Sequence, residues 1–516
     1  MLAATQSAAV IGIDAYEVTV EVDATKGLPQ WTIVGLAAHS IKESRERVSA
    51  ALTNSGYTLP PRRYTINLAP ADQRKDGTAF DLPIALAVLA ATGQLAPARV
   101  AGFVALGELG LDGTVRAVRG VLPVAMRMAQ RRPVLPLVVP PANAREAGLV
   151  AGLELWTPHT LRELVEAIGR GGPAVIAPDS VYSLEGATAA GDLPDLADVA
   201  GQETAKRALE IAAAGGHALL LVGPPGAGKT MLARRLPSIL PPLSREEALE
   251  VLAIQSVAGL IAASGLLHVQ RPFRAPHHSL SVAALIGGGS LPRPGEVSLS
   301  HHGVLFLDEL QEMPRARLDA LRQPMEDGRV VIARAQQTIA FPAQFALIGA
   351  MNPCPCGYAG DPARACACAA ADVAKHRARV SGPLADRIDM TVHVPPLSLG
   401  ALSAPASTPS SSTVRHRVVA ARDHQAARFH KVAGVRCNGQ ASGRWIDLHT
   451  SITSEARSLL VSAAERAGFS ARGFHRVLKV ARTIADLDGC DDVQRAHVGE
   501  AVFFRAPAVP SDGRCV

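Results

Sequence analysis

Hydrophobic and polar positions alternate near the start of the chain and then give way to helical spacing. In residues 10–22 apolar side chains tend to recur at every second position, which predicts a half-buried strand. Further strand-like runs lie at 64–68 and 137–139, and helical patterns lie at 40–52, 82–92 and 121–130. This alternation predicts an α/β domain over residues 1–168.

A second region carries apolar runs that each end in polar residues. It follows a Gly-, Ala- and Pro-rich stretch at 169–195, which we interpret as a linker, and a helical pattern at 202–214. The apolar runs lie at 218–222, 304–307 and 345–351. Such strands favour a parallel sheet with a ligand site outside their carboxyl ends, and we assign this domain to residues 196–400.

The remainder of the chain is helical and basic. Residues 401–413 are of low complexity and predict a second linker, residues 414–504 have helical patterns, and residues 505–516 form a tail. The net charge of +6 lies wholly in residues 401–516, which hold 16 basic and 10 acidic residues. This excess favours either a polyanion such as nucleic acid or simply a solvated, Arg-rich helical surface.

Composition narrows the class of protein. Hydrophobic residues make up 48% of the 516 residues, as in globular proteins. No apolar run reaches the length of about 18 residues that a membrane helix needs, and the amino terminus lacks a signal-peptide pattern. Four of the seven cysteines crowd into 354–368, which argues against a disulfide framework. We therefore expect a cytoplasmic protein that does not enter a membrane.

A phosphate-binding loop follows the strand at 218–222. The motif G-x-x-x-x-G-K-[ST] comprises Gly223, Pro224, Pro225, Gly226, Ala227, Gly228, Lys229 and Thr230. Its glycines let backbone N–H groups approach phosphate oxygens, Lys229 reaches the outer phosphates, and Thr230 offers a hydroxyl to Mg²⁺. The pattern predicts an ATP site.

Two acids complete that site. Asp308 and Glu309 directly follow the strand at 304–307. An acid at a strand end can hold Mg²⁺ together with Thr230, and a second acid can deprotonate the attacking water. We therefore expect hydrolysis of ATP, with Lys229, Asp308 and Glu309 at its centre.

Three further residues are candidates for contacts with the γ-phosphate. Asn352 ends the strand at 345–351 and is placed to bind the attacking water or the phosphate. Arg387 lies beyond it, where it would act on ATP of a neighbouring subunit or pair with Asp386 or Asp389 on the surface. Arg472 is a third candidate cation.

Cysteines and histidines form two other groups. Cys354, Cys356, Cys366 and Cys368 suit a tetrahedral Zn²⁺ site with four thiolates, or they are free thiols in a redox-labile loop. The pairs His277-His278 and His301-His302 are interpreted as loop or strand-edge residues rather than metal ligands.

Several longer strings resemble one family. They are the segments 273–281, 287–289, 294–300, 352–357 and 481–487, with sequences FRAPHHSLS, GGG, PGEVSLS, NPCPCG and ARTIADL. With the phosphate loop, they closely resemble the ComM/YifB family of magnesium-chelatase-like AAA+ ATPases over nearly the whole chain.

The resemblance implies a homohexameric ring with ATP sites between subunits, which binds DNA and drives branch migration of recombination intermediates during natural transformation. It implies that Asn352 is a sensor, that Arg387 acts across the subunit interface, and that Arg472 belongs to a C-terminal helical lid. The segments 271–302 and 329–341 resemble the insertion and hairpin that face the central channel. Arg329 and Arg334 on that hairpin would contact DNA or would serve solubility.

The N-terminal domain resembles the Lon protease C-terminal domain and its ribosomal protein S5 domain 2 relatives through residues 81–88 and 107–120. Lon-type proteolysis needs a serine nucleophile and a lysine base. Here Pro83, Ile84 and Ala85 stand where the serine belongs, and no lysine follows Gly120 in 121–124. We therefore interpret the domain as non-proteolytic.

For the whole chain, a chelatase-type or protein-remodelling ATPase remains the alternative to a DNA motor.

Overall fold

The chain divides into two compact units. The structure is a computed structural model, and it describes residues 1–36, 38, 41, 43–171, 193–261, 269–289, 292–334, 337–361, 364–380, 384–396, 409–432 and 434–505. Unit 1 comprises Met1–Ala187, Arg245–Val269 and Ala335–Ala340, and unit 2 comprises Thr188–Ser244, Gln270–Arg334 and Phe341–Val516. The predicted linker at 169–195 lies mostly outside the described residues.

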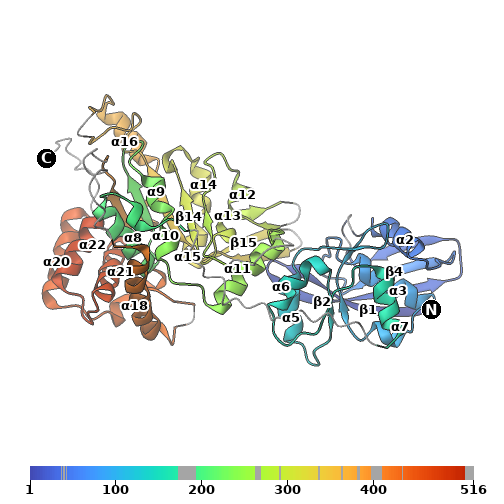
Figure 1. Cartoon of the computed structure of the whole chain (residues 1–516). Coiled ribbons are helices and arrows are strands. Elements are labelled where there is room, and N and C mark those ends of the chain that lie inside the picture. Colours follow the sequence, from blue (N-terminus) through green and yellow to red (C-terminus); the bar gives the residue numbers. More distant parts are fainter. Residues whose placement is uncertain are drawn as a thin grey trace. The chain divides into compact units, whose positions relative to one another are not determined.

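Unit 1 is built on a sheet with the strand order β3-β4-β2-β1-β5-β8-β9. Figure 1 labels its strands β1, β2 and β4. The strands are β1 Leu2–Ile11, β2 Asp14–Thr25, β3 Gln30–Val34, β4 Arg63–Ala69, β5 Val104–Ala105, β8 Leu137–Val138 and β9 Leu155–Trp156. Strands β1, β2 and β4 pair antiparallel, and the outer pairings are parallel. A short hairpin joins β6 Glu108–Leu109 to β7 Val115–Arg116.

The half-buried strand expected at 10–22 is confirmed as β2, in which Val18, Val20 and Val22 are buried. It begins only at Asp14, because the chain turns at Gly12 with φ of +65° and residues 10 and 11 belong to β1. The helices of this unit are α2 Ser44–Asn54, α3 Asp81–Ala91, α4 Pro97–Val100, α5 Val121–Ala129, α6 Ala144–Gly148, α7 Leu161–Gly169 and α11 Arg245–Ala258; α3 and α5 pack on β1 and β2, and α11 packs on α5. All eleven residues of α3 are buried, so this helix is the centre of the unit's core.

Unit 2 contains the predicted parallel sheet, with the order β11-β14-β17-β10-β18. Its strands are β10 Leu219–Val222, β11 Phe273–Arg274, β14 Val304–Leu307, β17 Ala346–Met351 and β18 Met390–His393. Leu219 pairs with Ile348 on one side and Met390 on the other, so β10 lies between β17 and β18. The three strands predicted from apolar runs are confirmed, and their carboxyl ends meet at one edge.

Both faces of this sheet are covered. Helices α8 Glu203–Gly215, α9 Lys229–Ala233 and α10 Leu236–Ile239 share one core with the C-terminal helices. These are α18 Ser411–Phe429, α19 Gly443–His449, α20 Ser454–Ala467, α21 Ala471–Leu487 and α22 Arg495–Arg505. The opposite face packs against shorter elements: α12 Val282–Ile286, α13 Glu296–Leu299, α14 Arg315–Ala320, α15 Arg322–Asp327 and β15 Arg329–Arg334. Strand β15 forms a two-stranded sheet with β16 Gln337–Pro342.

Two boundaries differ from the expected ones. Helix α18 begins at Ser411, where the Ser410 side chain accepts a hydrogen bond from the Thr413 N–H, so the second linker ends before residue 413. Residues 401–408 lie outside the described part. Within the range expected for the ATPase domain, Arg245–Val269 and Ala335–Ala340 cluster with unit 1.

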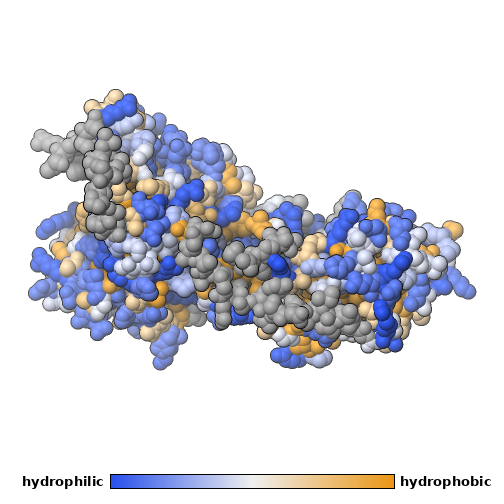
Figure 2. All heavy atoms as spheres, viewed as in Figure 1, coloured by the Kyte–Doolittle hydropathy of each residue, from blue (hydrophilic) through white to orange (hydrophobic). Residues whose placement is uncertain are grey.

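The surface is mixed in character. On the face shown in Figure 2, hydrophobic residues are dispersed among hydrophilic ones over the coloured atoms. Among the described residues, no helix combines the length and the apolar character needed to span a bilayer.

Candidate nucleotide site

The phosphate-binding loop lies between β10 and α9, as its motif predicts. Gly223 has no room for a side chain, because a Cβ there would lie 2.2 Å from the backbone oxygen of Val394. Gly226 and Gly228 have φ of +79° and +88°, which favours glycine at both positions. The loop therefore requires its glycines for close approach and for backbone conformation.

Lys229 is buried at the centre of this loop. Its Nζ donates to the carbonyl oxygens of Gly223 and Pro224 at 2.7 and 2.9 Å, and to Asn352 Oδ1 at 3.1 Å. Burial lowers the pKa of Lys229, while the charges of Asp308 and Glu309 oppose that shift. The three hydrogens of the ammonium group thus suffice for these two loop carbonyls and Asn352, and a phosphate would have to replace some of these partners.

Thr230 and Asp308 meet beside the lysine. The Thr230 hydroxyl donates to Asp308 Oδ2 at 2.8 Å, although 78 residues separate the two. Hydroxyl and carboxylate oxygens are the ligands that Mg²⁺ prefers, so this pair fits the metal that the sequence implies. Glu309 follows in an exposed, left-handed conformation with φ of +49°. Such backbone strain in a non-glycine residue clusters at functional sites.

Asn352 joins the lysine from the neighbouring strand. It directly follows β17, which lies between β14 and β10 in the sheet. His376 of α16 Ala370–Ala378 forms a hydrogen bond of 3.1 Å with the Asn352 backbone oxygen, which helps to fix its position. Sequence segments more than a hundred residues apart therefore converge at one edge of the sheet.

His278 is a site residue that the sequence reasoning missed. Its Nδ1 lies 3.2 Å from Glu309 Oε2. The two residues follow β11 and β14, which are adjacent in the sheet. The sequence pattern indicates only a loop or strand-edge residue at His278, and its one signal is its place in the string FRAPHHSLS.

Arg387 and Arg472 lie together but away from the phosphate loop. They line a cavity of about 550 Å³, and none of its described lining residues belongs to residues 223–230. Arg387 is buried and pairs with Glu326. Arg472 is exposed in the first turn of α21. Within one chain, the structure therefore does not bring these arginines to the phosphate loop.

Similar proteins share this organisation. Residues 195–402 match the family described as magnesium chelatase, subunit ChlI; residues 20–143 match the subunit ChlI of Mg-chelatase, and residues 408–505 match its C-terminal part. Over 507 residues the chain is 44% identical to YifB of Salmonella typhimurium, covering 98% of this chain and 97% of that protein. Over 509 residues it is 41% identical to competence protein ComM of Haemophilus influenzae, with 98% and 97% covered.

The chain belongs to the YifB/ComM family of magnesium-chelatase-like proteins. A more distant relative is the magnesium-chelatase 38 kDa subunit of Cereibacter sphaeroides, which is 26% identical over 171 residues, 30% of this chain and 51% of that protein. An AAA+-like ATPase domain is thus common to the YifB/ComM family and the chelatases, and here it carries the phosphate loop described above.

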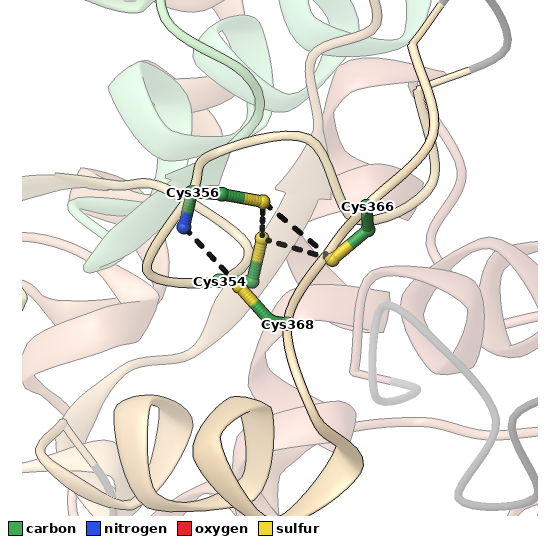
Figure 3. A group of neighbouring side chains, drawn as sticks. All are labelled: Cys354, Cys356, Cys366 and Cys368. Carbon is green, nitrogen blue, oxygen red and sulfur yellow. Dashed lines mark hydrogen bonds between the residues drawn. The ribbon is translucent and has the colours of Figure 1, made fainter.

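The cysteine loop of this YifB/ComM chain brings all four predicted thiols together. Figure 3 shows the sulfur atoms of Cys354, Cys356, Cys366 and Cys368 pointing toward one another. Their Sγ atoms all lie within 4.8 Å of each other. A hydrogen bond from the Tyr358 backbone N–H lowers the pKa of Cys356 to about 6, whereas burial raises the pKa of Cys354. The backbone N–H of Cys356 lowers the pKa of Cys368, but hydrogen bonds among the thiols outweigh it and raise that pKa to about 12.

The hairpin predicted near 329–341 is present as β15 and β16. Arg329 begins β15 and is exposed. Arg334 ends the same strand, but its side chain lies outside the described part of the structure. One of the two expected DNA-contacting arginines is therefore placed on the surface.

Proposed function

We propose that this protein is an ATP-hydrolysing ring motor that acts on DNA and promotes branch migration of recombination intermediates during natural transformation. The observation that carries the ATPase part is the convergence of Lys229, Thr230, Asp308 and Asn352, with Glu309 beside them. These residues come from three neighbouring strand ends of one parallel sheet.

In this proposal each residue has one task. Lys229 exchanges its loop carbonyls for the β- and γ-phosphates, and Thr230 and Asp308 hold Mg²⁺. Mg²⁺ neutralises phosphate charge when it is bound. Glu309 takes the proton of the attacking water, and Asn352 orients that water or the γ-phosphate. The four cysteines are proposed to hold a structural Zn²⁺.

The proposal makes the active unit a homohexamer. Arg387 and Arg472 line a cavity that the described phosphate-loop residues of the same chain do not reach. Both would act on ATP bound by an adjacent subunit, Arg387 by stabilising transition-state charge. The helices at 411–505 would then form the lid, and the N-terminal unit a non-proteolytic, Lon-like assembly or binding module.

DNA is favoured over other partners by two features. The 41% identical relative carries the name competence protein, and the whole positive charge excess lies in residues 401–516. Arg329 is exposed on its hairpin, where it would contact the phosphate backbone. Such contacts are independent of sequence and weaken with salt.

The proposal is tested by steady-state ATPase activity with no DNA, single strands, duplex and a four-way junction. We expect stimulation by DNA that is greatest on the junction, and turnover in the Glu309→Gln variant lower by about 10²–10⁴-fold with ATP binding retained. Turnover that Glu309→Gln leaves intact would refute the assigned site.

A chelatase-type or protein-remodelling ATPase is the second candidate, because residues 195–402 match the ChlI subunit. It predicts turnover that depends on Glu309 and is indifferent to every DNA, and stimulation by a protein partner instead. The same ATPase assay therefore separates the two functions.

A further inference from the structure

The four-cysteine loop has the dimensions of a metal site. Sulfur atoms of Cys354 and Cys356 lie 3.3 Å apart, and each lies 3.6 Å from Cys366 Sγ. A disulfide needs about 2.05 Å. Four sulfurs at about 2.3 Å from a tetrahedral Zn²⁺ lie roughly 3.8 Å from each other, so the observed spacing is close to that of a tetrathiolate site.

Backbone N–H groups already donate to two of the four sulfurs in this loop. The N–H of Ala359 donates to Cys354 Sγ at 3.2 Å, and the N–H of Cys356 donates to Cys368 Sγ at 3.4 Å. Hydrogen bonds of this kind orient metal ligands and offset their negative charge. Cys354 is fully buried and the other three are partly buried, as a closed structural site requires.

The loop contacts the nucleotide site directly. Cys354 stands two residues after Asn352, and Gly357 packs against the phosphate loop. A Cβ at Gly357 would lie 2.7 Å from Pro225 Cδ and 3.0 Å from Cγ. Because a proline ring is stiff, a shift of Gly357 would displace Pro225, and with it the phosphate loop.

The far end of the loop returns to the same place. Helix α16 begins at Ala370, just after Cys368, and its His376 bonds to the Asn352 backbone oxygen. A metal bound by all four cysteines would close the segment 354–368 into a ring. The start of the ring, at Cys354, would then fix Asn352 through the chain, and helix α16 after its end would fix Asn352 through His376. Gly357 within the ring would fix Pro225 of the phosphate loop.

We propose that Cys354, Cys356, Cys366 and Cys368 bind one Zn²⁺, and that the closed loop is a clamp that positions Asn352 and Pro225 for ATP hydrolysis. This rests on the proposed ATPase function. Oxidation or chelation at the cysteines would release the clamp and slow hydrolysis, although no cysteine touches the nucleotide.

Metal binding is tested on the full chain purified from zinc-supplemented medium. Elemental analysis should find one zinc per chain, and a mercurial thiol reagent should release it. The Cys366→Ser/Cys368→Ser variant should lose the metal. Cys490→Ser, at a similarly half-buried cysteine outside the loop, should keep it. Absence of zinc from the wild type, iron in its place, or zinc retained by the double variant would overturn the assignment.

The clamp is tested by substituting alanine for each of two glycines in the same loop. Gly357 and Gly360 have φ of +86° and +82°, so alanine is similarly strained at both, but only at Gly357 would its Cβ meet another atom within 4 Å. We expect Gly357→Ala to keep zinc and to lower kcat by at least about tenfold, and Gly360→Ala to stay near the wild type.

The outcomes separate the clamp from the ATPase proposal. Equal kcat values for the two glycine variants would refute the clamp while leaving Glu309-dependent turnover and the zinc content unchanged. Turnover that survives in Glu309→Gln would refute the ATPase site without altering the zinc content. Chelation that removes zinc and leaves kcat intact would also overturn the clamp.

Discussion

At the scale of single residues, His278 contacts Glu309, the proposed catalytic base. Glu309 is held in a left-handed conformation, and its carboxylate lies 3.2 Å from His278 Nδ1. A side chain held by such a partner is less free to turn toward an attacking water. We propose that His278 restrains the proposed catalytic base in this way.

Removing this partner should raise the basal activity. We expect His278→Ala to increase ATP turnover without DNA several-fold, and to reduce the additional stimulation that DNA provides. His277→Ala is the matched control, because the His277 ring packs on His278 at 4.1 Å but the described contact to Glu309 comes from His278. A loss of turnover as deep as that of Glu309→Gln would show instead that His278 positions the base.

The sequence predicts some of these residues better than others for a physical reason. Lys229, Thr230 and Asp308 follow strands with clear apolar runs, and the structure brings all three together. His278 follows β11, which has only two residues and therefore no readable pattern. Its approach to Glu309 depends on sheet order, which spacing alone does not reveal.

At the scale of elements, Asp389 ties β18 to two helices. It accepts hydrogen bonds from His217, which follows α8, at 3.3 Å and from Arg476 of α21 at 2.6 Å. Burial raises the pKa of Asp389, but His217, Arg476 and Lys479 outweigh that effect and hold the pKa well below its usual range. The carboxylate is therefore part of what joins the C-terminal helices to the sheet.

The Asp389→Asn substitution should destabilise the protein in a pH-dependent way. Near pH 7 we expect a loss of about 2–3 kcal/mol, because cationic partners are left unpaired. The folded-state pKa is depressed, so this contribution is present above the unfolded pKa of about 3.9 and fades as the pH falls below it. Denaturant unfolding from about pH 7 to about pH 3 measures the difference.

Asp386→Asn is the control for this series, since Asp386 is exposed three residues away. It should change the free energy of unfolding by less than about 0.5 kcal/mol at each pH. A destabilisation by Asp389→Asn that stays constant down to the acid limit would contradict the electrostatic account.

Helices and strands can be predicted from the sequence where their buried positions follow the regular spacing of apolar residues. The three strands predicted for unit 2 lie close to their predicted bounds, and the range 414–504, expected to be helical, carries most of α18 to α22. Strand β1 gave no such signal, because its buried Thr5 and Ser7 are polar and satisfy their hydroxyls on the carbonyl oxygens of Pro83 and Ala105. Composition alone does not distinguish a buried, bonded hydroxyl from an exposed one.

At the scale of the whole molecule, each compact unit is made of several separate segments of the sequence. Arg245–Val269 lies between the phosphate loop and Asp308 in sequence, yet it clusters with unit 1. Within that unit, the Gly120 N–H donates to the Ser256 backbone oxygen at 3.2 Å. Which unit a helix joins depends on such long-range contacts, so neither linkers nor periodicity could have predicted it.

The proposed ring makes Arg387 and Lys229 partners in different subunits, which mixing two inactive variants can test. Lys229→Ala subunits retain Arg387, and Arg387→Ala subunits retain a complete phosphate loop. In rings assembled from equal amounts, half of the loops are intact and half of the neighbours carry Arg387, so about one interface in four combines both. We expect each variant alone to be inactive and the mixture to regain roughly a quarter of wild-type turnover.

Mixing Lys229→Ala with Glu309→Gln is the control, because both changes damage the same side of the interface and no pairing restores it. Native mass spectrometry establishes that mixed rings form before turnover is compared. If mixed rings form and stay as inactive as either variant, Arg387 acts within its own chain. It would then have to leave Glu326 and cross from its cavity to the phosphate loop, which the described contacts do not favour. Recovery in the first mixture and not in the second places Arg387 opposite its neighbour's ATP.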